Sequence, residues 1–167
     1  MTNTEKFMEM VEMQENTDAL IFKKMRLLTP PQPSEYKLAI VDEVGELNHE
    51  LKGRWCWWQA TPTPIVWGKV REELVDIWHF CLSYLAHHIR FDREQFAAEI
   101  DYEKSSYYDP IDFLSQFMYP PTSVNMMKNV FEYLIGIGNN LGFDFDAVYQ
   151  AYKQKNAENN ERAESNY

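Results

Sequence analysis

Glu43-Val44-Gly45-Glu46 and Glu73-Leu74-Val75-Asp76 are two acidic stretches inside apolar, periodic segments of the chain. In each stretch the two carboxylates are three residues apart, and a helix advances by about 100° per residue. Both side chains of a pair therefore lie on one face of a helix and can reach a single point. Each pair can bind one cation.

Apolar residues lie on one side of each acidic pair, at the same helical offsets from it. They are Ile40, Val44, Leu47 and Leu51 around the first pair, and Val70, Leu74, Ile77 and Cys81 around the second. Two such helices can pack together and bring Glu43, Glu46, Glu73 and Asp76 to a shared rim. Four carboxylates would repel one another there unless a cation lies between them. A divalent cation that prefers oxygen ligands, usually Mg²⁺, suits such a site.

The rest of the chain predicts an all-α fold, a bundle of five or more helices, because helical periodicity recurs and strand-like alternation does not. Ser34 is expected to cap the second helix, and Thr122 or Ser123 a later one. The segment 91–119 is less informative, although residues 92–102 suit a helix with Phe96 and Ile100 inward. The main helices are expected at 5–28, 34–52, 69–89, 123–140 and from 144 or 146 onward.

Length and composition favour a single domain, 1–167, in a reducing compartment. A chain of 167 residues can bury enough surface to fold without disulfides. Cys56 and Cys81 show no paired spacing, and the N-terminus lacks the apolar run of a signal peptide. We therefore expect a cytoplasmic protein that does not enter a membrane.

The formal charge of −10 argues against non-specific binding to nucleic acid, which requires a basic surface. It leaves open a phosphorylated small molecule, because bound metal ions and a few cations can reverse the local field.

Gln14, Asn16 and Asp18 interrupt the apolar pattern of the first helix, and a solvated face is the simpler interpretation. The tail is similarly ambiguous. Asn156, Asn159 and Arg162 recur every three residues beside Lys155, which suits contacts to sugar and phosphate, but a frayed polar end is the simpler interpretation.

Trp55, Trp57 and Trp58 follow the first acidic helix within four residues. They suit either a core or interface, or a loop wall on which a nucleobase stacks. His49 and His79 raise another alternative, since each lies one turn after an acidic residue, as in di-iron carboxylate bundles. That alternative is weakened because the second copy reads Asp-x-x-His and no further helix offers a comparable buried glutamate.

Taken together, these stretches resemble the dimeric all-α dUTPases, a branch of the helical nucleoside triphosphate pyrophosphatases of bacteria, phages and trypanosomatids. Cys56 and Gln59 depart from the resemblance, because they occupy positions where that family commonly has lysines. The matching stretches, in order, are Met13-Gln14 with Asp18, Glu43 to Leu47, Trp55 to Trp58, Val70 to Phe80, and Lys155 to Arg162 closing on Tyr167.

The resemblance implies a homodimeric hydrolase of nucleotide metabolism that converts dUTP, and dUDP, to dUMP with Mg²⁺. It implies that Glu43, Glu46, Glu73 and Asp76 are catalytic and hold the metal, with Gln14 reading the uracil edge and Trp58 and Phe80 packing on the base. The substrate-binding residues that it implies are Gln14, Asp18, Trp55, Trp58, Phe80, Lys155, Asn156, Asn159, Arg162 and Tyr167.

Three alternatives stay open at this point. One is a related pyrophosphatase acting on dCTP or a modified nucleotide. The others are the di-iron carboxylate protein and a helical regulator without catalytic activity.

Overall fold

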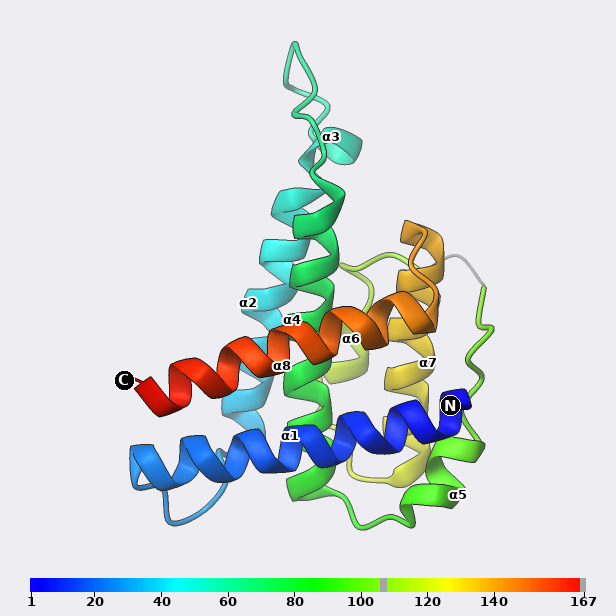
Figure 1. Cartoon of the computed structure of the whole chain (residues 1–167). Coiled ribbons are helices and arrows are strands. Elements are labelled where there is room, and N and C mark those ends of the chain that lie inside the picture. The colour runs from blue at the N-terminus through cyan, green and yellow to red at the C-terminus, as the bar shows by residue number, and fades with distance from the viewer. Residues whose placement is uncertain (106–107, 166–167) are drawn as a thin grey trace.

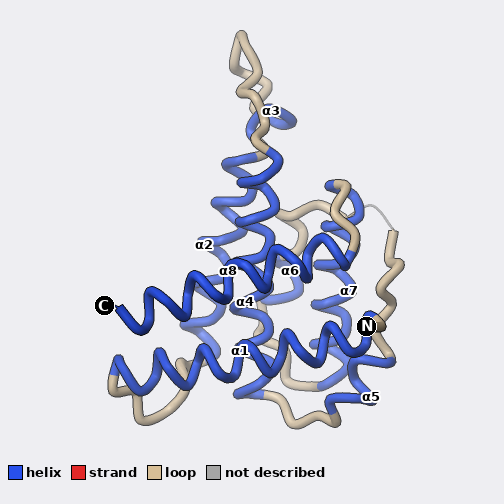
Figure 2. Tube along the Cα trace, in the orientation of Figure 1, coloured by secondary structure: helices blue, strands red, loops and turns tan. Residues whose placement is uncertain are grey.

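The computed structural model describes residues 1–105 and 108–165, and helices joined by loops, without a strand, make up these parts of the chain (Figure 2). The all-α prediction is confirmed. None of the described helices has the length and apolarity needed to cross a membrane. The helices are α1 (Asn3–Met25), α2 (Pro33–Glu50), α3 (Lys52–Trp55), α4 (Trp67–His88), α5 (Arg93–Ala98), α6 (Leu114–Phe117), α7 (Val124–Leu141) and α8 (Phe145–Ser165).

Helices α2 and α4 lie side by side and run antiparallel (Figure 1). The Tyr36 hydroxyl near the start of α2 lies 2.8 Å from the Ser83 hydroxyl near the end of α4. Both predicted apolar stripes are buried at this contact, with every residue between 0 and 4% exposed. Burial of a large apolar side chain stabilises a fold by roughly 1.5–3 kcal/mol, so the two stripes hold the pair together and leave the acidic residues along its border.

Helices α1 and α8 form a second pair, which crosses α4 (Figure 1). The Asn156 side chain donates to Thr17 at 2.8 Å, and the Lys24 ammonium donates to the Ala163 carbonyl at 2.6 Å. Residue numbers rise together on both helices, so α1 and α8 are parallel. This crossing places polar side chains of α1 and α8 over the same part of α4 that carries the second acidic pair.

An aromatic cluster joins α1, α4 and α7. The ring centroids of Phe7 and Phe131 lie 5.0 Å apart, and those of Trp78 and Phe131 lie 5.3 Å apart. All three side chains are at most 1% exposed. Edge-on and tilted ring contacts of this kind add to the stabilisation from burial.

The helix boundaries agree with the predicted ones in most places. Ser123 caps α7, and its hydroxyl accepts from the Met126 N–H, as expected. Ser34 is not a cap, because Pro33 already begins α2 and the Glu35 carboxylate accepts from the Gln32 N–H. The helix predicted at 92–102 is shorter, ending at Ala98.

Candidate active site

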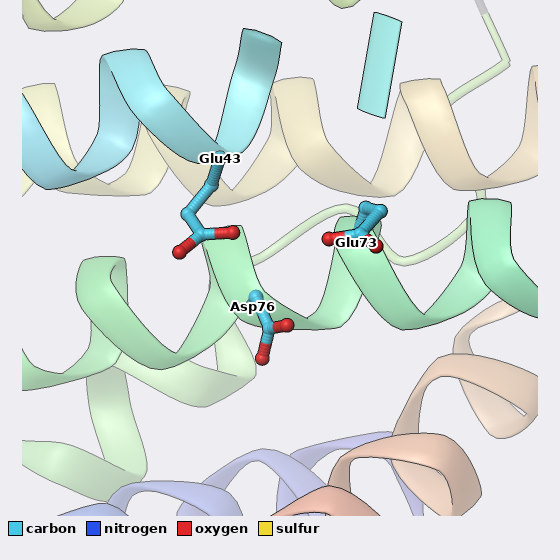
Figure 3. A group of neighbouring side chains, drawn as sticks. All are labelled: Glu43, Glu73 and Asp76. Atoms are coloured by element: carbon cyan, nitrogen blue, oxygen red, sulfur yellow. The ribbon is translucent and has the colours of Figure 1, made fainter. Parts of the chain in front are cut away.

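Glu43 on α2 and Glu73 and Asp76 on α4 form a cluster of carboxylates. Each side chain offers one oxygen, and these oxygens all lie within 4.8 Å of one another. Figure 3 shows Glu43 reaching from α2 toward α4, from which Glu73 and Asp76 project. All three residues are half-buried. The predicted convergence of the two acidic pairs is therefore present in the structure for these three residues.

Glu46, the fourth predicted member, lies at the outer edge of this carboxylate cluster. It is exposed and its oxygens are not within the mutual 4.8 Å of the other three. Its charge nevertheless acts on Glu43 and Glu73. Glu46 thus borders the cluster from the solvent side.

The carboxylates destabilise one another's charged form. Burial, followed by the charges of Asp76, Glu46 and Glu73, raises the pKa of Glu43 to about 7. Burial and then the charges of Glu46 and Asp76 likewise raise the pKa of Glu73 to about 7. Half-buried like charges of this kind are relieved when a cation binds between them. The donor set consists of carboxylate oxygens alone, which fits a hard divalent cation.

Lys155 on α8 supplies a positive charge at one end of the cluster. Its ammonium lies 2.8 Å from Asp76 Oδ2 and 2.9 Å from Glu72 Oε1. Burial raises the pKa of Asp76, while the hydrogen bond and charge of Lys155 act in the opposite direction. Lys155 therefore stabilises the ionised form of Asp76. Its charge also lowers the pKa of Glu73, but burial and the neighbouring carboxylates outweigh this effect.

A cavity of about 370 Å³ adjoins the carboxylate cluster, and Glu43 and Asp76 form part of its wall. Helices α1, α2, α4 and α8 all contribute to it. A volume of this order suits a small-molecule ligand. The lining residues that the sequence had predicted for substrate binding are Gln14, Asp18, Phe80, Lys155, Asn159 and Arg162.

Gln14 and Asp18 are buried, at 5% and 4% exposed, so the interpretation as a solvated face is wrong for these two residues, whereas Asn16 is exposed. Gln14 Nε2 donates to Asp18 Oδ1 at 2.8 Å. Gln14 Oε1 accepts from His79 Nδ1 and from the Tyr152 hydroxyl, each at 2.7 Å. The cavity wall at Gln14 is thus a buried hydrogen-bond network that joins α1, α4 and α8.

Helix α8 continues to Ser165, so the predicted frayed tail is wrong. Asn159 and Arg162 line the cavity. Asn156 does not line it: it is 4% exposed and bonded to Thr17. Tyr167, also predicted to bind substrate, lies outside the described residues.

Trp55 and Trp58 do not line the cavity in this chain. They lie on α3 and the loop after it, which project beyond the rest of the molecule (Figure 1). Trp57 is 86% exposed and Trp58 60%, and their ring centroids are 5.6 Å apart. A base against Phe80 therefore does not meet Trp58 of the same chain.

His79 lines the cavity, and Tyr152 donates a hydrogen bond to Gln14 in the cavity wall. Neither was among the predicted substrate-binding residues. His79 was considered only as an iron ligand, but its Nδ1 is bonded to Gln14 and His49 is exposed. Neither histidine joins the carboxylate cluster, so the arrangement does not fit a di-iron site. The available sequence signal was the polar pair Gln14 and Asp18, one turn apart within an apolar stripe.

Comparison with protein families matches residues 6–167 to the family model described as dUTPase. The match includes the segment 91–119, for which the sequence motifs gave no resemblance. No curated protein matches the chain.

Proposed function

The chain belongs to the dUTPase family and is a dUTP diphosphatase, and from this premise we propose which of its residues carry out the hydrolysis of dUTP. The reaction adds water across a phosphoanhydride bond and gives dUMP and diphosphate. The proximity of Glu43, Glu73 and Asp76, with oxygens within 4.8 Å, is the observation that carries the assignment. We extend the substrate range to dUDP, which would give dUMP and phosphate.

Enzymes of this family generally depend on a divalent metal, and we propose Mg²⁺ bound by Glu43, Glu46, Glu73 and Asp76. The all-oxygen donor set and the mutual repulsion of the carboxylates support this choice. When bound, such ions neutralise charge on phosphate oxygens and lower the pKa of water. Glu46, at the solvent edge of the carboxylate cluster, would complete the ligand set by turning inward.

Glu43 is proposed as the group that accepts the proton of the attacking water. It belongs both to the carboxylate cluster and to the cavity wall, so its carboxylate faces the space where a phosphate would lie. A general base must lie within hydrogen-bonding reach of the proton that it removes. Asp76 also belongs to both the carboxylate cluster and the cavity wall, but its carboxylate already accepts a hydrogen bond from Lys155. Glu43 is therefore the better candidate for the base.

The residues that line the cavity suggest an orientation for the bound nucleotide. Lys155 and Arg162 supply positive charge for the phosphates, and Asn159 lies beside them on α8 with an amide suited to the sugar. Gln14 and Phe80 lie in the wall that remains for the base. We propose that the uracil ring packs against Phe80 with one edge toward Gln14.

We also propose that the protein is a homodimer, as the resemblance implies. The exposed tryptophans on the projecting loop, with Trp55 at 42% and Trp58 at 60% exposed, are compatible with burial against a second copy. Their position outside the cavity of their own chain is also compatible with that arrangement. Size-exclusion chromatography with light scattering would test the oligomeric state.

The test of the proposed function is release of diphosphate, or of phosphate in the case of dUDP, from a panel of nucleotides, with and without a chelator. We expect rapid hydrolysis of dUTP with Mg²⁺, slower hydrolysis of dUDP, and little of dCTP or dTTP. Chelation should abolish turnover, and added Mg²⁺ should restore it. Equal turnover of dCTP and dUTP would instead support a broader pyrophosphatase, and turnover that survives chelation would contradict the metal assignment.

A further inference from the structure

Glu72 on α4 is bonded to Lys155, yet it belongs neither to the carboxylate cluster nor to the wall of the cavity beside it. Lys155 Nζ lies 2.9 Å from Glu72 Oε1 and 2.8 Å from Asp76 Oδ2. Glu72 and Asp76 are four residues apart, so they lie on one face of α4. The ammonium of Lys155 therefore bridges a proposed metal ligand and a carboxylate that the proposed hydrolysis does not use.

Lys155 lines two cavities, and Glu72 lines only one of them. The cavity beside the carboxylate cluster has Asp76 and Lys155 in its wall. A smaller cavity of about 120 Å³ between α4 and α8 has Glu72, Lys155 and Glu158 in its wall. Glu72 therefore acts on the larger cavity through Lys155 and not by touching a ligand there.

The ammonium of Lys155 needs both carboxylates because it is largely withdrawn from water. Its side chain is 13% exposed. An ammonium has three N–H donors, and a charge at such a position is stable only when it is paired and hydrogen-bonded. Within the described parts of the chain, Glu72 and Asp76 are the partners of this ammonium.

A cation at the carboxylate cluster competes with Lys155 for Asp76. Both are positive and both are attracted to the same carboxylate, so each weakens the attraction of the other to it. Glu72 reduces this competition, because it attracts the ammonium from a second direction. Without the charge of Glu72, the ammonium would have Asp76 as its anionic partner and would neutralise it more completely.

We propose that Glu72 is a positioning residue that shares Lys155 with Asp76 and thereby leaves Asp76 available to the divalent cation. This inference rests on the cation site of the proposed function. Residues that act on a metal ligand, without binding the metal, commonly change metal affinity by about 10- to 100-fold. The Glu72 side chain is 49% exposed, and solvent screens its charge, so the effect belongs at or below the lower end of that range.

The direct attraction between a carboxylate and a nearby cation is the competing explanation, because it requires no contribution from Lys155. Glu158 provides the comparison. It lines the same small cavity as Glu72 and lies one turn after Lys155 on α8. Its carboxylate accepts from Gln154, and Lys155 does not donate to it.

The experiment measures the dissociation constant of Mn²⁺, which prefers the same oxygen ligands as Mg²⁺, from the electron paramagnetic resonance of the free ion. It uses the full chain without nucleotide, so it does not depend on hydrolysis. The variants are Glu72→Gln, Glu158→Gln, Lys155→Met and the double variant Glu72→Gln/Lys155→Met. Glutamine keeps the size of the side chain and removes its charge, and the double variant completes a cycle that isolates the coupling between Glu72 and Lys155.

We expect Glu72→Gln to weaken Mn²⁺ binding by roughly three- to tenfold and Glu158→Gln to leave it unchanged. Lys155→Met should strengthen binding, because it removes the ammonium from Asp76, and adding Glu72→Gln to it should then have no effect. A loss that persists in the Lys155→Met background overturns the inference, because the charge of Glu72 would then act on the cation directly. Equal affinities of Glu72→Gln and Glu158→Gln also overturn it.

Steady-state kinetics separates this role from a merely structural one. Glu72→Gln should need more Mg²⁺ for half-maximal turnover of dUTP, and saturating Mg²⁺ should restore kcat, whereas a defect in folding is not restored by Mg²⁺. If Lys155→Met does not fold, as judged by circular dichroism, the comparison of Glu72→Gln with Glu158→Gln carries the test.

Failure of the proposed function gives a different result. The wild type then releases no diphosphate from dUTP, while the variants still differ in Mn²⁺ affinity as expected. A wild type that binds no Mn²⁺ overturns both the metal assignment and this inference.

Discussion

Among single residues, Asp76 is the carboxylate on which the cluster, the cavity and Lys155 meet. Asp76→Asn removes a charged oxygen ligand but keeps the shape of the side chain, and Lys155 retains its bond to Glu72. We expect turnover of dUTP to fall by at least about 100-fold, comparable to the loss of one electrostatic group in other active sites. Steady-state kinetics and circular dichroism will test this. Asp42→Asn, on the exposed side of α2, is the control and should keep its activity.

Arg162 contributes a single charged group at the rim of the cavity. Arg162→Ala should weaken binding of a non-hydrolysable dUTP analogue by about 10- to 100-fold, since hydrogen bonds to charged groups contribute about 1.5–3 kcal/mol. Arg90→Ala removes the same charge from an exposed position outside the cavity, and it should bind the analogue normally. Equal affinity of both variants for the analogue would show that Arg162 does not contact the phosphates.

At the scale of elements, Gly45 inside α2 and Gly53 in the short helix α3 that follows it predict opposite effects on stability. A Cβ on Gly45 meets nothing within 4 Å, so Gly45→Ala should stabilise α2 by roughly 0.5–1 kcal/mol. A Cβ on Gly53 would lie 2.2 Å from the Thr63 carbonyl oxygen, so Gly53→Ala must displace the returning loop and lower the melting temperature. Thermal unfolding of the two variants compares them directly. Destabilisation by Gly45→Ala would show that this face of α2 is packed against another chain.

Helix α8 depends on buried polar contacts for its attachment to α1. Asn156→Ala removes the bond to Thr17 and the bond from Asn160, and it should lower the free energy of unfolding by about 1–3 kcal/mol. Gln154→Ala, two residues away on the exposed side of α8, should change it little. Urea unfolding measures both. If Asn156→Ala is as stable as Gln154→Ala, the apolar residues of α8 suffice to hold it in place.

At the scale of the whole molecule, local patterns in the sequence predicted the α2 and α4 pair well. The offsets of the apolar stripes fix which faces of these helices meet, and the acidic residues beside the stripes then converge without further information. Glu46 lies at the outer edge of the carboxylate cluster because its side chain is exposed to solvent. Periodicity fixes the face of a helix more accurately than the orientation of a long side chain at its border.

The base-binding wall could not be predicted in the same way. Gln14 meets His79 across 65 residues and Tyr152 across 138 residues of sequence. These contacts arise from the crossing of α1 and α8 over α4, and no local pattern encodes a crossing. Gln14 and Asp18 alone look like a solvated face, and only the residues packed over them make them part of a site.

The stability of the whole molecule should depend on pH through the carboxylate cluster. Without metal, the pKa values of Glu43 and Glu73 are raised from 4.5 to about 7. Between these values the folded protein keeps protons that the unfolded chain has released, so the free energy of unfolding contributed by these groups falls as pH rises from 4.5 to about 7. Divalent ions bind the deprotonated carboxylates, so added Mg²⁺ should raise the melting temperature more at pH 8 than at pH 5.5.

The comparison with Glu43→Gln isolates this effect. His79, with a lowered pKa, gives the opposite pH dependence at acid pH, but it is present in both proteins and cancels in their difference. In chelator, Glu43→Gln should therefore exceed the wild type in melting temperature at pH 8 and lose this advantage at pH 5. With Mg²⁺ at pH 8 the order should reverse, because the variant has lost a charged ligand. An equal Mg²⁺-induced shift in the two proteins would place the cation somewhere other than between α2 and α4.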